Sequence, residues 1–126
     1  MKGLGLVHAI SHMVGAEYDT QHGLTNAILL PAVLRFNAPA IADKVTPMAQ
    51  AVGLQDTSFE AFHGWVCALL DDLSIPRSLS EIDVPADCAN RIAEKALQDS
   101  AAGTNPRACS VEEVEAVIHQ ALTKGR

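Results

Sequence analysis

The segment from residue 22 to residue 36 places apolar side chains around much of the circumference of one helix. A helix of that kind is stable only when other parts of the protein bury it. The chain has no alternating strand pattern longer than a few residues. We therefore predict an all-α, multi-helix domain enclosing this segment, whose apolar residues are Ala27, Ile28, Leu29, Leu30, Val33 and Leu34.

Start and stop signals divide the rest of the chain into further helices. They run over residues 3–16, over 38–52 up to a C-cap at Gly53, from an N-cap at Asp56, Thr57 or Ser58 to Pro76, over 85–98, and onward from a capping box at Ser110–Glu113. Proline is expected to bend the apolar helix at Pro31, to begin the next helix at Pro39, and to break that helix at Pro47. Leu79 and Ile82 are expected to anchor the loop before residue 85.

Composition narrows the classes of function. A chain of 126 residues forms one domain, residues 1–126, with a core of its own. Its residues are 48% hydrophobic but only 4% aromatic, which favours a helical interior of Ala, Leu, Val and Ile. The net charge of −6 argues against nucleic-acid binding. No apolar run approaches the roughly 20 residues that a membrane helix needs.

The three cysteines indicate a reducing compartment. Cys67, Cys88 and Cys109 are odd in number and show no C-x-x-C spacing. We interpret them as reduced, partly buried thiols of a cytoplasmic protein.

Three of the five histidines lie close together near the start of the chain. His8 and His12 are four residues apart, so a helix projects both from one face, where they could share a metal. His22 follows His8 by fourteen residues, which is roughly 21 Å along an unbroken helix. Two nitrogens on one metal lie no more than roughly 4 Å apart, so a shared site requires the chain to turn back.

The residues between the histidines permit such a turn. Gly15 weakens the first helix, and Asp19 and Thr20 are candidate N-caps for the second. The alternative from spacing alone is that His8 and His12 are ordinary polar residues on a helix face, since i, i+4 pairs arise readily by chance.

Longer stretches resemble the signature of iron-containing (group III) alcohol dehydrogenases. They are Gly5–Ala16 (GLVHAISHMVGA), Thr20–Pro31 (TQHGLTNAILLP), Arg35–Asn37 (RFN), Asp72–Pro76 (DLSIP) and Gly103–Arg107 (GTNPR). They occur in the order of the family, so the resemblance extends over essentially the whole chain. The resemblance implies the helical carboxy-terminal domain of these enzymes, an α-domain of the dehydroquinate synthase-like type.

The resemblance also implies roles for the histidines. In the family an aspartate and three histidines hold one divalent metal, usually iron and sometimes zinc; His8 and His22 match two of those histidines. His12 matches a histidine beside the metal, near the nicotinamide of NAD(P) and the substrate, and is assigned to proton transfer. The metal would act as a Lewis acid on the alcohol oxygen. Gln21 and Ala32 depart from the residues common in the family, proline and histidine.

The family's other two ligands come from a D-x-x-x-H segment upstream, and neither that segment nor the nucleotide-binding domain is present here. We therefore expect this chain to be inactive alone in converting small alcohols to aldehydes or ketones. The alternative is a helical assembly module or one chain of a split enzyme, with a nucleotide-binding partner chain. Maleylacetate reductases share the domain, although His22-Gly23 and Asn26–Pro31 favour the alcohol dehydrogenase branch. Self-association is expected, because helix faces that normally meet the absent domain would be exposed.

The remaining polar residues are interpreted mainly as structural. His63 and His119 are expected to be surface or half-buried residues within helices. Glu17 and Asp19 could add oxygen ligands to a metal, although the family does not use those positions. Asn105-Pro106-Arg107 is expected to form a turn into the capping box, and in the family this loop lies near the active-site cleft.

Overall fold

The computed structural model describes residues 5–98 and 110–123, and all regular elements in those ranges are helical. This confirms the predicted all-α fold. The elements are α1 (Gly5–Tyr18), α2 (His22–Ala51), α3 (Phe59–Asp72), the short 3-10 helices η1 (Leu79–Ile82) and η2 (Ala86–Cys88), α4 (Ala89–Gln98) and α5 (Val111–Thr123). The turn predicted at 105–107 and Cys109 lie outside the described residues.

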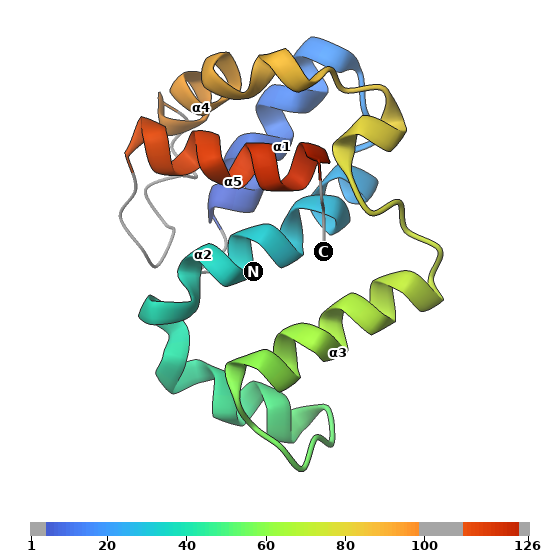
Figure 1. Ribbon diagram of the computed structural model, residues 1–126, viewed down its shortest axis with the longest axis vertical. Coiled ribbons are helices and arrows are strands. Elements are labelled where there is room, and N and C mark those ends of the chain that lie inside the picture. The colour runs from blue at the N-terminus through green and yellow to red at the C-terminus, as the bar shows by residue number, and fades with distance from the viewer. Residues whose placement is uncertain (1–4, 99–109, 124–126) are drawn as a thin grey trace.

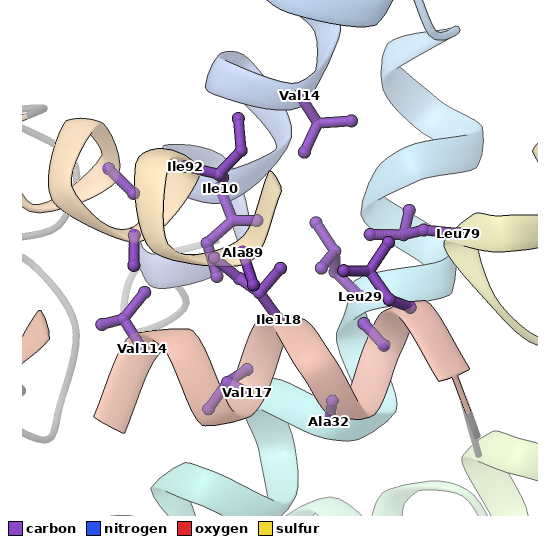
Figure 2. Close-up of a cluster of buried hydrophobic side chains, with 14 of the residues drawn as sticks. Ile10, Val14, Leu29, Ala32, Leu79, Ala89, Ile92, Val114, Val117 and Ile118 are labelled. Carbon is purple, nitrogen blue, oxygen red and sulfur yellow. The ribbon is translucent and has the colours of Figure 1, made fainter. Parts of the chain in front are cut away.

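The larger core lies where α1, the first part of α2, α4 and α5 meet (Figure 1). Ile10 of α1, Leu29 of α2, Ile92 of α4 and Ile118 of α5 are fully buried there (Figure 2). Leu79 of η1 closes the same core, as the anchoring role predicted for that loop requires. These residues are aliphatic, so the interior has the composition expected from the few aromatic residues.

A smaller core joins the second part of α2 to α3 (Figure 1). Ile41 and Val45 of α2 pack with Phe62, Val66 and Leu70 of α3, all of them buried. The helix α2 therefore contributes to both cores, and α3 joins the rest of the fold mainly along it.

The predicted division of α2 into two helices is wrong. The helix runs without interruption from His22 to Ala51 and contains Pro31, Pro39 and Pro47. Proline inside a helix removes a hydrogen bond and bends the axis, and Figure 1 shows the ribbon of α2 changing direction along its length. The helix continues because apolar residues on both sides of each proline are held by one or other core.

This continuity gives α2 the length of a membrane-spanning helix. By length and composition alone α2 could cross a membrane, with a mean hydropathy of 1.3 in its most apolar stretch. The sequence prediction considered uninterrupted apolar runs, and it did not anticipate one helix that continues over residues 22–51. Half of the stretch, 50%, is buried inside the fold, and core helices pass the same test.

Local capping explains where several helices begin and end. Gly53 has φ +83°, and the N–H groups of Gly53 and Leu54 donate to the carbonyls of Gln50 and Ala49, which makes a Schellman motif after α2. Ser58 is the N-cap of α3, so one of the three predicted candidates is confirmed. The helix α3 ends at Asp72, before the predicted stop at Pro76, through the same motif with Ser74 at φ +60°.

The predicted capping box and apolar stripe of α5 are confirmed. Ser110 and Glu113 form the expected capping box: the Ser110 hydroxyl accepts from the Glu113 N–H at 3.2 Å, and the Glu113 carboxylate accepts from the Ser110 N–H at 3.1 Å. The predicted apolar stripe of α5 is buried in full; it comprises Val114, Val117, Ile118, Ala121 and Leu122. The two cysteines that the structure describes, Cys67 and Cys88, are half-buried and buried respectively.

Candidate metal-ligand site

The corner between α1 and α2 turns the chain back on itself within three residues, 19–21. Asp19 adopts φ +55° and its N–H donates to the Gly15 carbonyl at 2.9 Å, which closes α1. The N-cap of α2 is Gln21, whose side-chain carbonyl accepts from the Leu24 N–H, and not Asp19 or Thr20 as predicted. Those two residues are occupied otherwise, since Asp19 ends α1 and the Thr20 hydroxyl accepts from Thr25 at 2.8 Å.

The corner brings His8 and His22 together. Their ring centroids lie 5.5 Å apart with the planes inclined at 33°, and both side chains are exposed. An unbroken helix would separate the two residues by roughly 21 Å. The predicted helix, tight turn and helix therefore exist, and they place two imidazoles side by side at the surface.

Two further side chains hold the ring of His22. The Ser11 hydroxyl lies 3.3 Å from His22 Nδ1, and the Asn26 side-chain nitrogen lies 3.1 Å from His22 Nε2. Ser11 is buried in the α1–α2 contact, whereas Asn26 lies one turn after His22 on α2. No role was predicted for either residue, although the i, i+4 spacing of His22 and Asn26 is a signal that sequence reasoning could have used.

His12 lies one turn after His8 on α1 and is exposed. Within residues 5–98 and 110–123, no three His, Cys, Asp or Glu side chains are grouped closely enough to hold a metal ion. Glu17, considered as an oxygen ligand, instead forms ion pairs with Arg91 at 2.8 Å and Lys95 at 3.6 Å, and these link α1 to α4.

The donors at the corner fit part of a transition-metal site. Imidazole nitrogen is a common ligand of iron and zinc, and a tetrahedral site needs four donors. His8 and His22 can supply two of the four. The Asn26 Oδ1 atom beside them is buried and has no hydrogen-bond partner, which marks the corner as a polar site that is not satisfied by the described residues alone.

The other histidines differ in burial. His63 is buried, not surface or half-buried as expected, and its Nε2 donates to the Pro31 carbonyl at 2.9 Å. Its Nδ1 lies 3.4 Å from Arg35 and 3.6 Å from the sulfur of Cys67. Because these contacts use both ring nitrogens, His63 is a hydrogen-bonded core residue between α2 and α3. His119 is exposed on α5, as predicted.

Known proteins match almost the entire chain. Residues 1–122 match the carboxy-terminal model of the Fe-containing alcohol dehydrogenase family. Lactaldehyde reductase of Escherichia coli K12 is 37% identical over 125 residues, a match that covers 94% of this chain and 33% of that enzyme. The crystal structure of a 1,3-propanediol oxidoreductase superposes with a TM-score of 0.89 at 34% identity, over 93% of this chain and 32% of that one.

A maleylacetate reductase from Agrobacterium tumefaciens has the same fold at lower similarity, with a TM-score of 0.76 and 26% identity over 96% of this chain and 32% of that one. The chain spans about a third of the length of the relatives it matches. The match over residues 1–122 includes the histidine segment and the helical fold described above. The chain belongs to the iron-containing alcohol dehydrogenase family and corresponds to its carboxy-terminal helical domain.

Proposed function

We propose that this chain provides two ligands, His8 and His22, to the divalent metal of an NAD(P)-dependent alcohol dehydrogenase. The observation that carries the proposal is the 5.5 Å approach of these two rings at an exposed corner of the domain. Small alcohols and aldehydes are the proposed substrates, in keeping with the relatives named for lactaldehyde and 1,3-propanediol.

Each of the three histidines has a proposed role. His8 and His22 contribute neutral nitrogens, and the exposed His12 moves a proton between the substrate oxygen and solvent. When bound, the metal supplies Lewis acidity and NAD(P) accepts or donates the hydride. The other two metal ligands and the nucleotide-binding domain must come from a further segment or a partner chain. By this proposal the chain alone is inactive, and its thiols belong to a reducing cytoplasm.

The test uses a chimera in which this chain replaces the matching third of E. coli lactaldehyde reductase. Stoichiometric metal by elemental analysis and NADH-dependent reduction of lactaldehyde are expected from the chimera, and neither from the chain alone. Metal and turnover in the chain alone, lost in His8→Ala, would contradict the proposed inactivity.

Three histidine variants of the chimera separate the roles. His8→Ala and His22→Ala are expected to lose the metal, because each removes one of four donors. His12→Ala is expected to keep the metal and to lose roughly 10²–10⁴-fold in kcat, the usual contribution of a general acid–base. His119→Ala, which removes an exposed histidine on α5, is the matched control and should change neither quantity. Full metal content in His8→Ala would exclude the proposed site.

The second candidate function is that of a helical assembly module that retains the fold without the chemistry. Like the first proposal, it is compatible with the absence of any group of three candidate ligands among the residues described. The two proposals differ in the chimera: an assembly module would produce a folded protein with no metal that depends on His8 or His22.

A further inference from the structure

The ring of His22 contacts protein groups through both nitrogens. Nδ1 faces the hydroxyl of Ser11 on α1 at 3.3 Å, and Nε2 faces the side-chain amide of Asn26 at 3.1 Å. Ser11 has 1% of its surface exposed, so no solvent competes for its hydroxyl. These two contacts limit the orientation of the ring and the position of its proton.

A neutral imidazole has one N–H and one lone pair, and its partners decide which nitrogen has which. An amide nitrogen can only donate, so the Asn26 Nδ2 beside Nε2 requires the lone pair there. The proton then sits on Nδ1 and is donated to the Ser11 oxygen, which can accept it.

We propose that Ser11 and Asn26 are positioning residues that hold His22 as the Nδ1-protonated tautomer, which leaves the Nε2 lone pair as the one that a metal would take. The inference rests on the function proposed above and specifies how one ligand is prepared. The Asn26 N–H occupies the lone pair in the metal-free chain and must move aside when a metal binds. A histidine ligand commonly donates its second N–H to a fixed acceptor, and Ser11 provides that acceptor.

The reverse assignment would place Oδ1 of Asn26 against Nε2–H. It exchanges the two ends of the amide, so the buried position that now holds the unpartnered Oδ1 would hold the NH₂ group. A carbonyl oxygen without a partner is tolerated more often than a buried N–H without one. The orientation in the structure is therefore the less costly of the two.

Long-range ¹H–¹⁵N correlation spectra of the ¹⁵N-histidine-labelled, metal-free chain test the assignment directly. At a pH where His22 is neutral, we expect a protonated-type Nδ1 signal and an unprotonated-type Nε2 signal. Protonation at Nε2 would overturn the inference.

Two variants are expected to change which ring nitrogen of His22 carries the proton. In Ser11→Ala the acceptor at Nδ1 is lost, so the fraction of Nδ1-protonated His22 should fall. In Asn26→Asp an acceptor replaces the donor at Nε2, so the proton should transfer to Nε2. Ser80→Ala, which removes a hydroxyl bonded to the Leu122 carbonyl instead, is the control and should leave His22 unchanged. An unaltered tautomer in both test variants would contradict the proposed roles.

Metal affinity supplies a second readout. In the chimera, Ser11→Ala is expected to weaken metal binding by about 10–100-fold in a chelator competition, as loss of a partner behind a histidine ligand commonly does. Unchanged affinity would contradict the positioning role. The tautomer is measured without metal, so an Nε2-protonated His22 overturns this inference alone. A chimera whose metal does not depend on His22 overturns the proposed function.

Discussion

The ion pair between Arg35 and Glu60 links α2 to α3 at the surface of the smaller core. The guanidinium donates two hydrogen bonds to the carboxylate, at 2.9 and 3.1 Å, and lies 5.5 Å from the centre of the Phe59 ring. These hydrogen bonds hold the pKa of Glu60 below its ordinary value of 4.5. Both side chains are largely solvent-exposed, so screening keeps the contribution small.

The lowered pKa of Glu60 fixes the sign of a pH effect. Its stabilising contribution is complete above the ordinary pKa of 4.5 and is lost as the pH falls through the lower folded value. Glu60→Gln should therefore lower the urea midpoint at pH 7, and the gap between wild type and variant should close as the pH is reduced below 4.5. Urea unfolding of the wild type and of Glu60→Gln at several pH values across this range measures the gap in midpoint. A gap that widens in acid would contradict the assignment.

Two glycines should respond to alanine in opposite directions. Gly64 lies inside α3, and a Cβ added there would meet no atom within 4 Å, so Gly64→Ala should stabilise the protein by about 1 kcal/mol. The Tm should rise by about 4 °C in thermal unfolding. Gly53 has φ +83°, so Gly53→Ala should lower the Tm. Equal shifts of one sign in the two variants would refute this explanation.

Reasoning from single residues predicted that His8 and His22 lie close together, because their spacing requires a turn if they act together. It missed Ser11 and Asn26. Their contacts depend on the rotamer of His22 and on the way α1 packs against α2, and neither is encoded in spacing. The burial of His63 was missed for the same reason, since its partner is the carbonyl of Pro31 on another helix.

At the level of elements, the caps of helices were easier to predict than whether a helix continues through a proline. The capping boxes and glycine stops are local, so the ends of α5 and α2 could be anticipated. The unbroken course of α2 could not, because the rule that proline ends a helix is also local. Packing of apolar residues beyond each proline, against α1, α5 and α3, outweighs the lost hydrogen bonds.

The capping box of α5 gives a test at this scale. Ser110→Ala removes the oxygen that accepts the Glu113 N–H at 3.2 Å, and loss of such a cap costs about 1 kcal/mol. Because α5 covers the larger core, the loss should appear in global unfolding by urea. Ser110→Asp retains an acceptor and is expected to restore most of the difference. A Ser110→Ala variant as stable as wild type would show that the box adds nothing.

The molecule as a whole is two unequal cores joined by α2. The larger core contains α1, α4 and α5, while α3 meets the fold mainly at the smaller core. Amides of α3 should therefore exchange with solvent through a partial opening that leaves α4 and α5 protected. Native-state hydrogen exchange in low denaturant measures this. Identical opening free energies for α3 and α5 would mean that the domain opens only as one unit.

Two exposed apolar side chains lead to a further prediction for the isolated chain. Leu69 near the end of α3 and Leu73 at its C-cap are 41% and 62% exposed. We expect concentration-dependent self-association through this surface, weakened in Leu69→Glu and retained in Ala68→Glu, which places the same charge at the preceding, also exposed, position of α3. Sedimentation velocity over a range of protein concentrations measures this association. A wild-type chain that remains monomeric throughout would rule out the association.

The corner of α1 and α2 keeps its histidines on the outside, while the inner faces of the same helices build the larger core. Exposed substitutions away from special backbone positions usually change stability by no more than about 0.5 kcal/mol. Substitution of His8, His12 or His22 should therefore change or remove the proposed chemistry with little effect on folding. Such a layout favours evolutionary divergence: a lineage can exchange one metal or substrate for another, or lose activity altogether, and still inherit a foldable domain.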